Sequence, residues 1–184
     1  MATYIVGDVQ GCYDELNRLL DVIQFDASSD RLGFCGDLVN RGPDSWRVLQ
    51  FIRSLPHAFT ILGNHDIYLL ALYYGSFARI PVPHTMDSLL NHSDMDDIAQ
   101  WLSQQPLFYY DKHLNYCLVH AGIPVQWSVI QAQQYAEEVS HAIQSDNAKH
   151  VLGNLWGNEP SCWDEVFAEA ERLRYITNAL TRLR

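Results

Sequence analysis

Three short apolar runs in the first part of the chain each end in a glycine that is followed by a polar residue. The runs cover residues 3–7, 31–36 and 58–63. Between the runs, apolar side chains recur at the spacing of one helix face, which predicts amphipathic helices. The first such set is Leu16, Leu19, Leu20 and Ile23. This order of strands and helices predicts an α/β fold with a largely parallel sheet.

Helical and strand patterns also alternate in the rest of the chain. The predicted elements are a loop with a short helix (76–93), a helix (94–104), a hairpin (107–110 with 115–119) and a long helix (130–144). After these elements, a tryptophan-rich loop and a terminal segment show no decisive period. Because no repeat or linker interrupts the sequence, we expect a single domain over residues 1–184.

Residues with metal-binding chemistry follow the predicted strands. Asp8 and Asp37 follow the first two runs, Asn64-His65 follows the third, and His120 follows the strand at 115–119. In open α/β sheets ligands bind at the carboxyl ends of strands, so we expect these side chains to converge. Carboxylate and amide oxygens suit hard cations, and imidazole suits transition metals. One Gly-Asp pair is commonly a turn, but its recurrence favours a two-metal phosphohydrolase.

Composition narrows the class of protein further. Hydrophobic residues make up 48% of the chain and charged residues 18%, which is typical of a globular protein. The net charge of −10 makes DNA an unexpected partner, because nucleic-acid binders usually carry a basic surface. The four cysteines lack C-x-x-C spacing, and no apolar stretch approaches a membrane span. We therefore expect a reduced cytoplasmic protein without a membrane partner.

Four ordered motifs carry a family resemblance. They are Gly7-Asp8-Val9-Gln10-Gly11, Gly36-Asp37-Leu38-Val39-Asn40-Arg41-Gly42, Gly63-Asn64-His65-Asp66 and His120-Ala121-Gly122. They resemble the motifs of the phosphoprotein-phosphatase branch of the calcineurin-like metallophosphoesterase superfamily. The Met-Ala-Thr-Tyr start, the Gly-Cys-Tyr-Asp-Glu-Leu stretch and Tyr175-Ile176-Thr177-Asn178-Ala179 look like the bacterial symmetrical dinucleoside tetraphosphatase family. The resemblance implies an αββα sandwich.

The resemblance also implies a set of metal ligands. Asp8 would bind one metal, Asp37 would bridge two metals, and Asn64 would bind the second through its amide oxygen. His120 would be a further ligand of the second metal. Gln10 stands where most of the branch has a histidine, so it would offer a weaker carbonyl oxygen. The implied cofactors are two divalent ions, Mn or Co first, with Fe, Zn, Ni or Mg as alternatives.

The remaining roles concern the substrate. His65 would protonate the departing nucleotide, and Arg41 would clamp a phosphate. Further candidates for substrate contact are Asn40, Asp66, Arg172 and Arg174. The loop Leu155-Trp156-Gly157-Asn158 resembles a family loop near the site. The implied reaction is hydrolysis of diadenosine tetraphosphate to two ADP by a bridging hydroxide, with nucleotide-capped RNA ends as a second substrate class.

Two departures from the family pattern leave alternatives open. Asn40 replaces the aspartate that orients the catalytic histidine in protein phosphatases, which disfavours the alternative of a phosphoserine/threonine phosphatase. The sequence also ends before a further Gly-His motif whose histidine binds the second metal in the family. We therefore expect a sandwich that is incomplete at the C-terminus, and an inactive nucleotide-binding fragment is a third reading.

Overall fold

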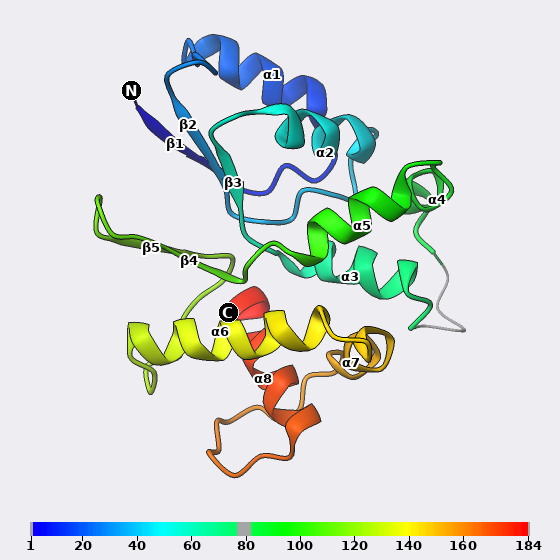
Figure 1. The fold of residues 1–184 in the computed structure, drawn as a ribbon, viewed down its shortest axis with the longest axis vertical. Helices are drawn as coiled ribbons and strands as arrows, with labels where there is room; N and C mark the ends of the chain where they lie inside the picture. Colours follow the sequence, from blue (N-terminus) through cyan, green and yellow to red (C-terminus); the bar gives the residue numbers. More distant parts are fainter. Residues whose placement is uncertain (1, 77–81, 184) are drawn as a thin grey trace.

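A three-stranded parallel sheet forms the N-terminal layer of the molecule. The computed structural model describes residues 2–76 and 82–183. The strands are β1 (Thr3–Val6), β2 (Arg31–Phe34) and β3 (Ala58–Thr60), in the order β1-β2-β3, with α1 (Tyr13–Val22) and α2 (Ser45–Ser54) between them. Thr3 pairs with Arg31, and Leu32 pairs with Ala58. The prediction of a parallel sheet is confirmed (Figure 1).

Helices and one hairpin make up the rest of the described chain. The elements are α3 (Asn64–Tyr73), α4 (His84–Leu90), α5 (Met95–Ser103), β4 (Phe108–Asp111), β5 (Tyr116–Val119), α6 (Val129–Ile143), α7 (Ala148–Asn154) and α8 (Glu169–Arg182). The hairpin is antiparallel, as expected. The short helix predicted within residues 76–93 is α4, and the part of that prediction at 77–81 lies outside the described residues. No described helix is long and apolar enough to cross a membrane.

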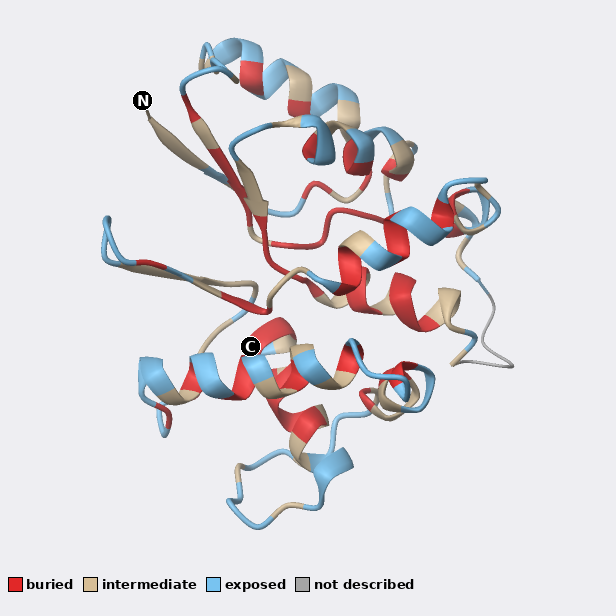
Figure 2. Ribbon diagram, viewed as in Figure 1, coloured by how far each residue is buried: buried red, intermediate tan, exposed pale blue. Residues whose placement is uncertain are grey.

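Helix α3 lies between the N-terminal half, which holds the parallel sheet, and the C-terminal helices α6, α7 and α8 (Figure 1). Its residues Ile67, Leu69, Leu70 and Ala71 are all at most 1% exposed, and a helix that is apolar on most sides must be covered on most sides. It contacts α4, α5 and α7. Figure 2 shows α3 largely buried, in the region between the parallel sheet and the helices α6, α7 and α8. Because α3 begins at Asn64, its packing fixes the position of three predicted site residues, Asn64, His65 and Asp66.

A partly buried ion pair connects the parallel sheet to the hairpin. Arg31 Nη1 lies 2.7 Å from Asp111 Oδ2, and Arg31 Nη2 donates to the Tyr109 hydroxyl at 2.8 Å. The N–H groups of His113 and Leu114 also donate to Asp111 Oδ1, each at 2.9 Å. These donors, with Arg31 first, hold the pKa of Asp111 at about 2, below its ordinary value of 3.8.

The stability that this ion pair contributes is expected to depend on pH. A carboxyl group whose pKa is lowered on folding stabilises the fold fully above its unfolded pKa and loses that effect as pH falls through the folded pKa. The free energy of unfolding of the native chain should therefore exceed that of Asp111→Asn by a constant amount above about pH 5, and the gap should narrow between about pH 5 and pH 2. Urea unfolding across this range measures the gap. Asp21→Asn, at an exposed position, is the matched control, and a gap that stays constant down to pH 2 would contradict the prediction.

Candidate active site

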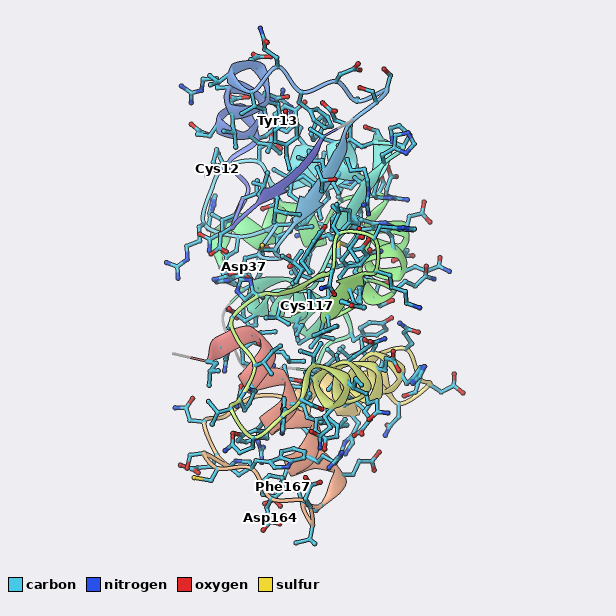
Figure 3. All side chains as sticks on the ribbon, turned by 90° about the vertical axis from the view of Figure 1, so that its left-hand side faces the viewer. Cys12, Tyr13, Asp37, Cys117, Asp164 and Phe167 are labelled. Atoms are coloured by element: carbon cyan, nitrogen blue, oxygen red, sulfur yellow. The ribbon has the colours of Figure 1, made fainter. Side chains whose placement is uncertain are left out.

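A polar cavity of about 690 Å³ lies where the strand ends meet α8. Its lining residues are Asp8, Gln10, Asp37, Arg41, Asn64, His65, His120, Ala121, Asn158, Thr181, Arg182 and Leu183. The structure thus brings together all five residues expected to bind metal, with His65 and Arg41 beside them. Asp37 lies midway along the molecule, between the parallel strands and α8 (Figure 3).

Two carboxylates and one imidazole form the part of the cavity that fits a cation. Ligand atoms of Asp8, Asp37 and His120 all lie within 4.8 Å of one another. His120 Nδ1 lies 2.7 Å from the carbonyl oxygen of Cys35. Because a carbonyl only accepts, Nδ1 carries the hydrogen and Nε2, which lies 3.7 Å from Asp37 Oδ1, keeps its lone pair. A backbone partner of this kind is typical of metal-binding histidines.

Gln10 lies against both carboxylates through its amide nitrogen. Its Nε2 donates to Asp8 Oδ2 at 3.3 Å and to Asp37 Oδ2 at 3.4 Å. The amide oxygen would have to turn toward a cation to serve as a ligand, so this role of Gln10 stays a prediction. In the arrangement observed, the amide draws the two carboxylates together and offsets their mutual repulsion.

Unusual backbone conformations aim the site side chains. The left-handed region, which is uncommon for residues other than glycine, is occupied by Gln10, Asp37, Asn40 and Arg41, with φ values of 48°, 50°, 76° and 62°. Gly36 has φ of 85°, and a Cβ atom there would lie 2.3 Å from the backbone nitrogen of Gly63. The loops after β2 and β3 therefore meet backbone to backbone, which only glycine allows, and this contact brings Asp37 next to Gly63, the residue before Asn64.

Asp66 holds the same two loops together from inside. Its side chain is 0% exposed. Asp66 Oδ2 accepts hydrogen bonds from the N–H groups of Asp37 (2.7 Å) and Gly63 (2.9 Å), and Oδ1 accepts one from Leu38 (2.9 Å). Burial, followed by the nearby Asp37 carboxylate, raises the pKa of Asp66 to about 7, although the three donors oppose the rise. The sequence suggested that Asp66 contacts substrate, and its complete burial corrects that expectation.

His65 presents one edge of its ring to the cavity. Its backbone N–H donates to Asp37 Oδ1 at 2.8 Å, and its Nε2 lies 3.8 Å from Asp37 Oδ2. The other ring nitrogen, Nδ1, lies 2.9 Å from Asn40 Nδ2. Burial is the main cause that lowers the pKa of His65. Asn40 therefore contacts His65 rather than the cavity, where the sequence had suggested a substrate contact.

The two arginines of α8 that the sequence suggested lie away from the cavity. Arg172 forms two hydrogen bonds to the Glu138 carboxylate, at 2.7 and 2.9 Å, and lies over the ring of Tyr135. Arg174 Nη1 donates to the carbonyls of Asn154 and Trp156, both at 3.4 Å. The structure thus gives both side chains other partners, which corrects the expectation that they reach phosphate.

Arg182 is the cavity cation that the sequence reasoning missed. It lines the cavity together with Asn158, and its guanidinium lies 4.6 Å from the centre of the Trp156 ring. A signal was available, because Arg182 follows Asn178 of the recognised motif by one helical turn and so shares its face of the helix. The family-like loop around Trp156 supplies Asn158, as the resemblance implied.

Comparisons with known proteins identify close relatives. The calcineurin-like phosphoesterase family profile matches residues 1–176. Proteins named symmetrical bis(5'-nucleosyl)-tetraphosphatase are 50% identical over 182 residues in Coxiella burnetii (99% of this chain, 62% of that protein) and 46% identical over 185 residues in Psychromonas ingrahamii (100% and 67%). The chain thus spans about 62% of the length of the Coxiella relatives.

Two solved structures are similar to this chain. A crystal structure described provisionally as a diadenosine tetraphosphatase is 36% identical, with a TM-score of 0.60 over 70% of this chain and 54% of that chain. A cold-active protein tyrosine phosphatase is 22% identical, with a TM-score of 0.55 over 95% of this chain and 63% of that chain. At that identity the second likeness concerns the fold alone.

Proposed function

The chain belongs to the calcineurin-like phosphoesterase family, and from this we propose that it hydrolyses diadenosine tetraphosphate symmetrically to two ADP. The observation that carries the proposal is the convergence of Asp8, Asp37 and His120 within 4.8 Å, in a cavity that Asn64 also lines. The relatives named above support the choice of a dinucleoside tetraphosphate as substrate. Nucleotide-capped RNA ends, which share the phosphoanhydride chain, are a second substrate class, and a cytoplasmic location stays a prediction.

Carboxylate, amide and imidazole ligands fit two divalent cations, and we propose Mn or Co before Fe, Zn, Ni or Mg. Asp8, Asp37, Asn64 and His120 would hold them, with Gln10 as a weaker candidate. When bound, such a pair lowers the pKa of a water molecule and neutralises phosphate charge. The protein itself would contribute positive charge from Arg41 and Arg182, which line the same cavity.

His65 would act on the leaving group. Its Nε2 faces the cavity next to Asp37, and its Nδ1 is occupied by Asn40. The N–H at Nε2 can form a hydrogen bond to the oxygen that leaves with ADP, which stabilises the negative charge that develops there. In protein phosphatases an aspartate stands where this chain has Asn40, so the asparagine favours the tetraphosphatase over a phosphoserine/threonine phosphatase.

Product analysis tests the proposal. The chain is incubated with Mn²⁺ and diadenosine tetraphosphate, and the nucleotides are separated by anion exchange. We expect ADP as the sole product, loss of activity with EDTA, and recovery when Mn²⁺ is added back, because the ligand set binds cations reversibly. ATP with AMP would contradict symmetric cleavage. Phosphate release from phosphopeptides alone, or nucleotide binding without turnover, would favour the two alternatives instead.

A further inference from the structure

Thr85 reaches the site from a segment outside all four motifs. It lies in the first turn of α4, and its Oγ1 is 2.5 Å from Asn40 Oδ1. Asn40 Nδ2 is in turn 2.9 Å from His65 Nδ1. We propose that Thr85 is a positioning residue that sets the tautomer of His65 through Asn40, so that the ring hydrogen sits on Nε2 and faces the cavity. The tautomer itself does not depend on the proposed function. Only the catalytic role of the Nε2 hydrogen rests on it.

The distances favour one orientation of the Asn40 amide. A hydroxyl–carbonyl hydrogen bond is commonly about 2.5–3.0 Å long, whereas an N–H···O bond is commonly about 2.7–3.2 Å. The 2.5 Å contact with Thr85 therefore fits Asn40 Oδ1, to which the hydroxyl donates. The amide nitrogen then faces His65 and has only hydrogens to offer, so His65 Nδ1 must accept and the hydrogen is left on Nε2.

Two hydrogen bonds hold the backbone of Asn40 in place. The Asn40 N–H donates to Ser45 Oγ at 3.0 Å, and its carbonyl accepts from Gly42 N–H at 2.7 Å. On the opposite side, α4 is anchored by Met86 and Leu89, which are 0% and 2% exposed. Both ends of the Thr85–Asn40 contact are thus fixed, and the threonine hydroxyl selects which amide atom faces the imidazole.

The choice of tautomer changes what His65 can do. With the hydrogen on Nε2, the cavity edge of the ring donates to an oxygen of the polyphosphate. If the amide of Asn40 turned over, its oxygen would accept from Nδ1–H of His65, and Nε2 would present a lone pair to the substrate. Thr85 would therefore contribute to catalysis without touching the substrate.

Three forms of the chain test this inference: the native chain, Thr85→Val and Thr85→Ser. Valine removes the hydroxyl, and serine restores it at the same carbon. Long-range ¹H–¹⁵N correlation spectra of the metal-free, ¹⁵N-histidine-labelled chain report the His65 tautomer, with His65→Gln used to assign its signals. We expect the Nε2–H form in the native chain and in Thr85→Ser, and a shift toward Nδ1–H in Thr85→Val.

Kinetics with Mn²⁺ and diadenosine tetraphosphate provide the second readout. We expect Thr85→Val to lower kcat by about tenfold, a part of what a hydrogen-bond donor to the transition state contributes, with little change in KM, and Thr85→Ser to recover the rate. A native His65 in the Nδ1–H form, or a valine variant with the native tautomer, would overturn the inference. If the native chain shows no turnover, the proposed function fails separately, and the spectra still decide the role of Thr85.

Discussion

Asp37→Asn is expected to lower the rate of diadenosine tetraphosphate hydrolysis by on the order of 10³-fold, comparable to the loss of a central electrostatic group in other active sites. Asp37 is 2% exposed, and its two carboxylate oxygens face His120 and His65. An amide supplies one neutral oxygen and one N–H₂ group, and the latter cannot bind a cation. We therefore expect tight Mn²⁺ binding to be lost together with turnover.

Calorimetric titration with Mn²⁺ and a steady-state rate assay measure the two losses. Asp21→Asn makes the same chemical change at an exposed position and should behave as the native chain does. We expect the variant to keep its packing, because the backbone N–H of residue 37 still donates to Asp66. Near-ultraviolet circular dichroism checks this. Native affinity for Mn²⁺ in Asp37→Asn would show that this carboxylate is not a ligand.

His65→Ala is expected to reduce kcat by about 10²–10³-fold, the usual contribution of a hydrogen-bond donor to charge that develops in the transition state. Metal affinity should change much less, because the ring is assigned to the leaving group and the backbone N–H that donates to Asp37 is retained in alanine. The separation of these two effects would distinguish His65 from the proposed metal ligands around it.

The same pair of measurements, rate and Mn²⁺ affinity, serves for His65→Ala. His141→Ala removes an exposed histidine on α6 and is the matched control for loss of an imidazole. A variant that keeps a near-native rate at saturating Mn²⁺ would exclude His65 as the donor. A variant that loses the metal as well would indicate that the ring is itself a ligand.

The parallel sheet and the convergence of its strand ends could be predicted because both follow from local patterns. Each apolar run ends in glycine, and parallel strands place their carboxyl ends at one edge, so Asp8, Asp37 and Asn64 could be expected to meet. The glycines also mark the close approach of two loops, as the contact between Gly36 and Gly63 shows. In these elements the local sequence pattern was therefore sufficient to predict where the residues lie.

The roles of several charged residues could not be predicted, because they depend on partners far away in the sequence. Arg172 is held by Glu138, 34 positions earlier, and no local pattern announces that pairing. Asp66 follows His65 directly, but successive residues on a helix point about 100° apart, so the carboxylate turns into the core while the imidazole faces the cavity. Thr85 belongs to a segment without a motif, and only the fold brings its hydroxyl to Asn40.

The carboxylate of Asp66 has a consequence for how this protein could be re-engineered. Because this one side chain accepts hydrogen bonds from the loop after β2 and from the loop after β3, a shift of one loop would break bonds that also hold the other. Changing the length of one loop would leave a buried acceptor of Asp66 without its donor and would not simply widen the spacing of the proposed metal ligands. A different metal preference is therefore more accessible by exchanging the liganding atoms than by re-spacing the scaffold that carries them.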